Sequence, residues 1–293
     1  MRIINNIKPE YFNKYILKGC MRSIFYSPSD TDSLCRLINK ILEIFDTKKM
    51  SPANISILDL GCGSCIPTIL LSETLSEKSI KSNIKAIDID EEAINVGKRN
   101  IKKMGLENVN LEKKDIISLL NEEINENIFL IVSNPPYLPI PEKFKTKNLI
   151  CVDGGEFGTK YTTTILRYPK VRFLGIQTSS LSDPNKTLDE IFLNGFIIEH
   201  LNIIETKFGL YTTKPFIRKH IKKLKEGKKC YFHDDRYLIL GFILEKTNKN
   251  VRTAEIKQEF LEFLDSYSKS GLKNAYEPKV TFKIDYMRYK HIL

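Results

Sequence analysis

The sequence predicts a doubly wound α/β fold of the Rossmann-like type, built on a mostly parallel sheet. Three observations support this prediction. Short apolar runs alternate with helical patterns along residues 55–133, a Gly-x-Gly turn follows the first run, and a carboxylate or amide residue falls at the end of each run. Such folds bind their ligands at the edge where the parallel strands end. The residues expected at that edge are Asp59, Asp88, Asp115 and Asn134.

Two helices are predicted ahead of the first strand. Residues 8–21 have the pattern of a short helix that docks on the body of the protein. A longer helix follows residues 25–32, because apolar residues recur at helical spacing from Leu34 to Phe45. Its N-cap candidates are Ser29, Asp30 and Thr31. A helix N-terminus presents free N–H groups, so we expect this one to be able to meet a carboxylate.

The first predicted strand, residues 55–60, runs into a turn that contains Gly61 and Gly63, and an apolar helix follows over about 67–75. A strand, a glycine pair and a helix N-terminus together make the first turn of a nucleotide-binding fold. The third glycine of the dinucleotide fingerprint is absent from the expected position. The turn alone therefore indicates a nucleotide site only weakly.

The second and third predicted strands also end near carboxylates. Residues 84–88 end in Asp88, at about the distance from the glycine turn at which such folds place a carboxylate on a ribose diol. Residues 109–111 lead to Asp115. Each of these carboxylates alone is typical of a helix cap or a turn, but their joint placement favours a ligand site.

The fourth predicted strand, residues 128–133, is followed directly by Asn134-Pro135-Pro136-Tyr137. Neither proline donates to a sheet ladder, and each restricts the residue before it, so the backbone of this tetrapeptide is nearly rigid. The Asn134 side-chain oxygen and the Pro135 carbonyl can present two acceptors to the hydrogens of a planar –NH2 group, with Tyr137 stacking over its face. A plain turn or a polyproline ligand is the alternative interpretation.

The composition of the chain limits the classes of protein to which it can belong. The chain has 293 residues, 42% of them hydrophobic, and no stretch approaches the roughly 20 apolar residues of a membrane span. The first residues carry no signal-peptide pattern, so we expect a cytoplasmic protein. The six cysteines are expected to be free thiols. Cys62 and Cys65 have the spacing of zinc ligands, but no second pair follows at a suitable distance, and we expect no metal.

The positive charge is concentrated in the C-terminal third of the chain. Residues 1–204 hold 26 Lys and Arg against 25 Asp and Glu, whereas residues 205–293 hold 20 against 11. Such a surplus indicates an acidic partner, with nucleic acid or a ribosome-associated protein as the leading candidates. A merely solvated lysine-rich surface explains the count equally well.

Four motifs together resemble the class I S-adenosylmethionine-dependent N-methyltransferases, and among them the HemK/PrmC-like family, which methylates glutamine N5 of peptide release factors. The motifs are Asp59-Leu60-Gly61-Cys62-Gly63, Ala86-Ile87-Asp88-Ile89-Asp90, Lys114-Asp115-Ile116 and Ser133-Asn134-Pro135-Pro136-Tyr137. Three further stretches that resemble this family are residues 29–34, 153–158 and 176–181. The resemblance covers residues 24–204. It implies a seven-stranded methyltransferase sheet and S-adenosylmethionine as the cofactor.

The resemblance also implies roles for individual residues. The cofactor-binding residues would be Thr31, Asp59, Gly61, Gly63, Asp88, Ile89, Asp115 and Asn134. In this arrangement Asp59 and the loop around Thr31 hold the amino-acid end of the cofactor. Asp88 accepts hydrogen bonds from the ribose, Ile89 packs on the adenine, and Asp115 lies near its amino group. The catalytic residues would be Asn134, Pro135, Pro136 and Tyr137.

Three segments are expected along the chain. Residues 1–23 would form a docking segment, residues 24–248 the methyltransferase domain with a basic insert at about 212–235, and residues 249–293 a basic aromatic extension. In the extension, aromatic residues interleave with lysines and arginines, from Tyr276 to Lys290. This pattern is typical of a surface that binds nucleic acid and equally of an amphipathic segment that docks on the core.

Three functions are compatible with these observations. The first is methyl transfer to a glutamine side chain of a protein such as a peptide release factor, with a small activating partner as an open question. The second is methyl transfer to adenine N6 or guanine N2 of RNA or DNA, because a flipped-out base presents the same planar –NH2 group. The third is a cofactor-binding scaffold without activity, which has no need for Asn-Pro-Pro-Tyr. The resemblance favours the protein acceptor.

Overall fold

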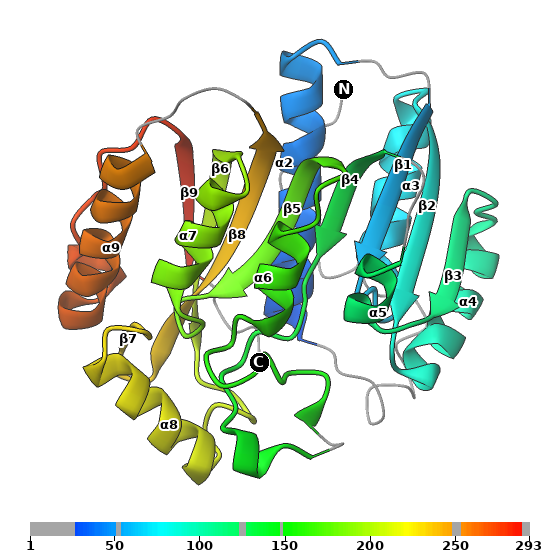
Figure 1. The fold of residues 1–293 in the computed structure, drawn as a ribbon. Helices are drawn as coiled ribbons and strands as arrows, with labels where there is room; N and C mark the ends of the chain where they lie inside the picture. Colours follow the sequence, from blue (N-terminus) through cyan, green and yellow to red (C-terminus); the bar gives the residue numbers. More distant parts are fainter. Residues whose placement is uncertain (1–26, 51–53, 123–126, 147–148, 248–252, 289–293) are drawn as a thin grey trace. The chain divides into compact units, whose positions relative to one another are not determined.

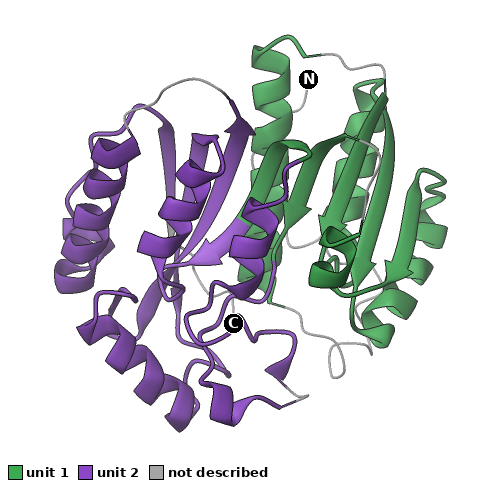
Figure 2. Ribbon diagram, in the orientation of Figure 1, with its two compact units in different colours: residues 1–134, 170–176 green, residues 135–169, 177–293 purple. Residues whose placement is uncertain are grey.

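The computed structural model describes residues 27–50, 54–122, 127–146, 149–247 and 253–288 (Figure 1). The chain divides into two compact units (Figure 2). Unit 1 comprises residues 1–134 and 170–176, and unit 2 comprises residues 135–169 and 177–293. The docking helix predicted at residues 8–21 lies outside the described residues.

Unit 1 is built on parallel strands in the order β3-β2-β1-β4-β5. The strands are β1 (Asn54–Leu60), β2 (Lys81–Asp88), β3 (Val109–Lys113), β4 (Ile128–Ser133) and β5 (Val171–Ser179), of which residues 177–179 belong to unit 2. The register places Leu60 beside Ile87 on one side and Ser133 on the other. A parallel sheet whose order reverses at β1 is the doubly wound arrangement, so the predicted fold class is confirmed.

The helices of unit 1 are α2 (Pro28–Thr47), α3 (Ile66–Glu77), α4 (Glu91–Met104) and α5 (Ile116–Leu120). The apolar face of α2 packs on β4 and β5. The Phe45 ring lies 5.3 Å from that of Phe129 and 5.0 Å from that of Phe173, centroid to centroid. A Cβ at Gly175 would lie 2.6 Å from Ile41 Cδ1, so the glycine lets the helix pack close to β5.

Helix α2 begins two to four residues earlier than the N-cap candidates predicted from the sequence. Ser27 is its N-cap, and the Ser27 hydroxyl accepts a hydrogen bond from the Asp30 amide (3.4 Å). The prediction of Ser29, Asp30 or Thr31 as the N-cap was therefore wrong. The reason is Pro28, whose fixed φ and missing N–H suit the first helical position.

Unit 2 contains an antiparallel pair, β6 (Phe196–Lys207) with β8 (Arg236–Lys246), and two further strands. The short β7 (Phe232–His233) pairs with β8, and β9 (Lys283–Arg288) runs parallel to β6. The helices of this unit are α6 (Lys160–Leu166), α7 (Pro184–Leu193), α8 (Pro215–Glu226) and α9 (Thr253–Ser270), with 3-10 turns at Glu142–Phe144 and Leu272–Asn274. In the described residues β7 and β9 add to the seven strands expected.

The C-terminal extension docks on unit 2. Phe260 and Phe263 of α9 are buried, and the Tyr286 ring of β9 packs against Phe263 at 6.0 Å. The Tyr276 hydroxyl donates to the Glu259 carboxylate (2.6 Å). Strand β9 of this segment pairs with β6, as docking requires, whereas Tyr276 and Tyr286 stay 36% and 39% exposed, so the nucleic-acid interpretation stays a prediction. Tyr289 and Lys290 lie outside the described residues.

Two expectations from composition concern the cysteines and the membrane. The described cysteines, Cys35, Cys62, Cys65, Cys151 and Cys230, are free thiols, as predicted. Cys20 lies outside the described residues.

Among the helices of the described ranges, none combines the length and the apolar character that crossing a bilayer requires.

Candidate functional site

The chain turns sharply between β1 and α3. The amides of Gly61 and Cys62 both donate to the Ile87 carbonyl at the end of β2 (2.9 Å each), which ties the turn to the neighbouring strand. Gly61 and Gly63 have φ values of +79° and +54°, a region that glycine adopts without strain. A Cβ at Gly63 would meet no atom within 4 Å. Open space therefore lies in front of this turn.

Two other elements of unit 1 lie close to Gly61. From a Cβ placed on Gly61, the nearest atoms are Ile116 Cδ1 at 3.8 Å and the Asn134 carbonyl oxygen at 3.9 Å. Ile116 opens α5, and Asn134 follows β4. The ends of β1 and β4 are held together because the Ser133 hydroxyl donates to the Leu60 carbonyl (2.6 Å). The predicted edge of the sheet thus brings the start of α5 and the end of β4 close to the glycine turn.

Asp59 is the most deeply buried carboxylate of this edge, with 1% of the residue exposed. Its Oδ2 accepts a hydrogen bond from the Thr68 hydroxyl of α3 (2.5 Å), whereas its Oδ1 has no hydrogen-bond partner among the described residues. Burial raises the pKa of Asp59 to about 7, and the Thr68 hydrogen bond opposes this shift. A buried carboxylate with a vacant acceptor suits a cationic group, which would restore its ordinary pKa.

Asp88, at the end of β2, is hydrogen-bonded to the glycine turn. Its carboxylate oxygens accept from the amides of Gly63 and Asp90, both at 2.9 Å. Burial raises the pKa of Asp88, and these two hydrogen bonds oppose the shift. Each carboxylate oxygen can accept a second hydrogen bond, so the group stays able to bind hydroxyls of a ligand. Ile89, next in the chain, is 42% exposed.

The other two predicted cofactor residues lie in helix termini. Asp115 is the N-cap of α5 and accepts from the Ser118 amide (2.9 Å). Thr31 lies in the first turn of α2, one helical turn before Cys35. Cys35 packs in one apolar cluster with Cys62 and Cys65 of the glycine turn. The face of α2 that carries Thr31 is thereby directed to this part of unit 1.

Asn134 is the last residue of unit 1. Its side-chain oxygen Oδ1 is buried and has no hydrogen-bond partner within the described part of the chain. A buried polar atom without a partner is costly, and a ligand that donates to it would remove this cost. The structure thus leaves open the acceptor that the sequence predicted for a planar –NH2 group.

Unit 2 begins at Pro135, and here the loop after Tyr137 holds the Tyr137 backbone. The Tyr137 carbonyl accepts from the buried Ser182 hydroxyl (2.5 Å). A Cβ at Gly158 would lie 2.4 Å from that same carbonyl, and Gly158 has a φ of +73°. A Cβ at Gly154 would lie 2.8 Å from the Tyr137 carbonyl carbon. The glycine-rich stretch at residues 153–158 is therefore a close packing surface for the motif.

A Gly158→Ala substitution should destabilise unit 2 by about 2 kcal/mol, because it places a side chain at positive φ and against the Tyr137 carbonyl. Urea unfolding measures this. The matched control is Gly209→Ala, where a Cβ would meet nothing within 4 Å and φ is not positive. Equal stability of the two variants would contradict the packing role of Gly158.

Sequence reasoning missed two supporting residues. Thr68 orients Asp59, and its signal is a hydroxyl within the apolar run of residues 66–71 at the start of α3. Ser182 holds Tyr137, but it lies 45 residues away in the chain and only the folded structure pairs the two. The described residues contain no cluster of three or more His, Cys, Asp or Glu side chains of the kind that holds a metal.

The residues at this edge fit S-adenosylmethionine. The unpartnered Asp59 Oδ1 and its raised pKa suit the ammonium group of the methionine part. The open space at Gly63 admits a close approach of that part to the backbone. The spare acceptor capacity of Asp88 suits ribose hydroxyls.

A doubly wound sheet with a glycine turn after β1 and a carboxylate at the end of β2 is a nucleotide-binding arrangement, and S-adenosylmethionine-dependent methyltransferases are one class built on it. Residues 51–262 match the family described as "Methyltransferase domain", and the chain belongs to this family. The predicted enzyme class and cofactor are thereby confirmed.

Two curated relatives match part of the chain. The release factor glutamine methyltransferase of Streptococcus pneumoniae (strain ATCC BAA-255 / R6) is 32% identical over 99 residues, which are 34% of this chain and 32% of the relative. The enzyme with the same description from Buchnera aphidicola subsp. Schizaphis graminum is 36% identical over 106 residues, 36% and 34% of the two chains. The matched region thus spans about a third of the length of each relative.

Solved structures with a similar fold are more distant in sequence. A class I S-adenosylmethionine-dependent methyltransferase of Listeria monocytogenes, described as putative, is 18% identical, with a TM-score of 0.48 over 89% of this chain and 65% of that one. The E. cuniculi Mtq2–Trm112 complex, which methylates the eRF1 termination factor, is 16% identical in sequence. Its TM-score is 0.43 over 76% of this chain and 99% of that one. M. jannaschii TYW2 in complex with AdoMet is 14% identical in sequence, with a TM-score of 0.42 over 77% of this chain and 80% of that one.

Proposed function

We propose that this protein transfers a methyl group from S-adenosylmethionine to a planar amide or amino nitrogen, and that the acceptor is a glutamine side chain of a protein such as a peptide release factor. The observation that carries the proposal is the buried, unpartnered Asn134 Oδ1 at the end of β4, directly before Pro135, Pro136 and Tyr137. An acceptor atom in this state suits an N–H of the target nitrogen.

The residues would act by positioning and by electrostatics. When bound, S-adenosylmethionine supplies a methyl group already activated on a sulfonium cation. Asp59 would bind the ammonium end, and Asp88 would accept from the ribose hydroxyls. Asn134 Oδ1 and the Pro135 carbonyl would accept both hydrogens of the target –NH2 group and so aim its lone pair. The nitrogen loses a proton as the N–C bond forms, when that proton becomes acidic, so we expect no dedicated general base.

The glutamine acceptor is supported by the relatives. Both curated proteins that match the chain are described as release factor glutamine methyltransferases. Because the match covers about a third of each of them, the acceptor is a proposal for this chain and not an inheritance from them. The need for a small activating partner, which the sequence leaves open, is tested by adding cell lysate in the assay below.

A nucleobase amino group is the second candidate acceptor. It presents the same planar –NH2 donor pair to Asn134, provided that the base is flipped out. The surplus of positive charge in residues 205–293 favours it, since nucleic acid is the commonest polyanionic partner.

The two acceptors are separated by labelling. The purified protein is incubated with S-adenosylmethionine that carries a radioactive methyl group, and with a cell lysate treated either with nuclease or with protease. Label that survives only in the nuclease-treated lysate supports a protein acceptor, and release factors are then tested singly. Label that survives only in the protease-treated lysate overturns the glutamine proposal in favour of RNA or DNA. Absence of label from both overturns both acceptors.

An Asp88→Ala variant should bind S-adenosylmethionine about 10- to 100-fold more weakly than the wild type, because hydrogen bonds between a carboxylate and the ribose hydroxyls are lost. Isothermal titration calorimetry measures this affinity. Unchanged affinity would remove Asp88 from the proposed site.

The control for Asp88 is Asp90→Ala. Asp90 is the N-cap of α4 and accepts from the Glu92 amide (2.9 Å), two residues from Asp88. Its loss should cost about 1 kcal/mol of stability, as for other N-caps, and should leave cofactor affinity unchanged. The pair of variants separates ligand binding from support of the helix.

A further inference from the structure

The positive charge of the C-terminal third is concentrated in and around helix α8. Residues 214–229 hold eight Lys and Arg and one acidic residue, Glu226. By contrast, residues 249–293 hold nine Lys and Arg against six Asp and Glu. The segment of highest positive charge is therefore α8 with its flanks and not the C-terminal extension.

Most of these cations have no carboxylate partner within the described ranges. Lys229 pairs with Asp183 (3.6 Å) and Lys225 donates to the Phe232 carbonyl (2.7 Å). The six cations that remain, called the α8 cation surface below, are Lys214, Arg218, Lys219, Lys222, Lys223 and Lys228. Lysines of the neighbouring helix differ, since Lys257 pairs with Asp189 and Lys269 with Asp265 (2.5 Å each). Uncompensated charges on one helix create a local positive field that attracts a polyanion.

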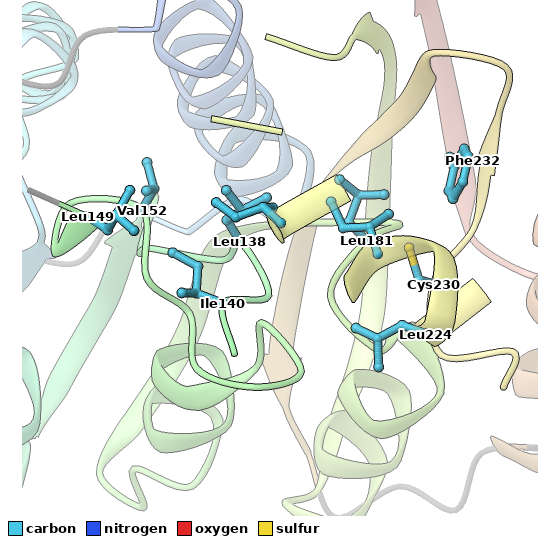
Figure 3. Packing of buried hydrophobic residues seen from close by; sticks show 10 residues of the cluster. Leu138, Ile140, Leu149, Val152, Leu181, Leu224, Cys230 and Phe232 are labelled. Atoms are coloured by element: carbon cyan, nitrogen blue, oxygen red, sulfur yellow. The ribbon is translucent and has the colours of Figure 1, made fainter. Parts of the chain in front are cut away.

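Helix α8 is firmly anchored on its other face. Ile217, Ile221 and Leu224 are buried in an apolar cluster with residues of the segment that follows Tyr137, among them Leu138 and Val152 (Figure 3). His220 Nε2 lies 2.7 Å from the Glu156 carbonyl oxygen, within hydrogen-bond distance. The cations are thus displayed from a fixed helix, so that binding a ligand need not order the backbone.

Partly exposed aromatic rings lie at the N-terminal end of this surface. Phe216, in the first turn of α8, packs on Phe144 with ring centroids 4.5 Å apart. Phe208 lies under the Arg218 guanidinium, 5.2 Å from it. All three rings are half-buried. An acidic peptide needs only the cations, whereas unpaired nucleobases also stack on such rings, so the combination favours single-stranded nucleic acid.

We propose that the α8 cation surface binds the phosphate backbone of single-stranded nucleic acid, with bases stacking beside Phe216. The binding does not depend on which nitrogen accepts the methyl group and needs no cofactor. It would retain an RNA-containing particle or a nucleic-acid substrate on the same unit that carries Tyr137.

The test is fluorescence anisotropy with a labelled, mixed-sequence single-stranded RNA of about 16 nucleotides, and with DNA of the same sequence, at several salt concentrations and without S-adenosylmethionine. In the test variant, Lys219→Gln/Lys223→Gln, two exposed lysines one turn apart are neutralised on α8. The matched control is Lys98→Gln/Lys102→Gln on α4, also exposed and one turn apart. Glutamine keeps helix propensity, and circular dichroism checks that both variants fold.

The α8 variant should bind RNA about tenfold more weakly, and its slope of log affinity against log salt should fall by about two, one for each lost phosphate contact. The α4 control should bind within about twofold of the wild type, as its lysines lie outside the proposed surface. Equal losses in both variants would overturn the proposal in favour of a general effect of net charge. A polyglutamate peptide of the same charge that binds as tightly as RNA would overturn it in favour of an acidic protein partner.

Discussion

An Asn134→Ala variant is expected to bind S-adenosylmethionine as tightly as the wild type and to transfer methyl groups at least about a hundredfold more slowly. Removal of one preorganised polar group at a reacting centre typically costs this much. The side chain is assigned to the acceptor nitrogen, because its buried Oδ1 has no partner among the residues described. Binding is measured by calorimetry, and transfer by radioactive label in single-turnover assays.

Two further variants sharpen this prediction. Asn134→Gln keeps the amide but moves it by one methylene. Because the role depends on position, we expect the rate of methyl transfer to fall nearly as much as in Asn134→Ala. Asn110→Ala removes an exposed asparagine from β3 and should behave as the wild type in both assays. Undiminished turnover of Asn134→Ala would remove Asn134 from the catalytic role proposed for it.

The affinity for S-adenosylmethionine should depend on pH through Asp59. Without ligand its pKa is raised to about 7 by burial, whereas a bound ammonium group favours the ionised carboxylate. Below pH 7 binding must therefore expel a proton. The affinity should fall by about tenfold for each pH unit below 7 and level off above it. Calorimetry in buffers of different ionisation enthalpy also counts the released proton.

Two substitutions test the assignment to Asp59. Asp59→Asn should lower the affinity at pH 8 by about 10- to 100-fold and flatten the profile between pH 5 and pH 8. Thr68→Val removes the hydrogen bond that lowers the pKa of Asp59, so the midpoint of the profile should move to higher pH. A profile that Asp59→Asn leaves unchanged would show that another group titrates.

The same shift has a consequence for stability. The folded-state pKa of Asp59 is raised above its unfolded value of 3.8, so the folded state binds more protons. Without ligand, Asp59 therefore stabilises the folded state at low pH, and this contribution to the free energy of unfolding is lost as the pH rises from about 4 to about 7. A bound cation stabilises the ionised carboxylate of Asp59 and so removes this loss of stability at higher pH.

The elements of unit 1 could be predicted because each carries its own local signal. The fourth strand, predicted at residues 128–133, is β4 with those same bounds, since a β-branched run ends at two prolines. The first strand and the glycine turn were predicted within one residue. The start of α2 was not, because Ser29, Asp30 and Thr31 are as good caps by type as Ser27, and Pro28 decides between them.

What depends on contacts distant in sequence was beyond prediction. The C-terminal extension has a pattern that suits a nucleic-acid surface as well as a docked segment, and only the fold shows that its strand β9 pairs with β6. The glycine-rich stretch was noticed only as a resemblance. Its role became clear from the position of the Tyr137 carbonyl between Gly158 and Ser182. In the sequence these residues carry no sign that they meet.

The anchoring of α8 bears on how such an enzyme could change its target. Its buried face carries Ile217, His220, Ile221 and Leu224, while Lys219, Lys222 and Lys223 are exposed on its outer face. Substitutions on the outer face therefore leave both the packing and the strand ends of unit 1 intact. Recognition can diverge in a lineage, or be redesigned, by surface changes on one helix while the methyl-transfer chemistry is conserved.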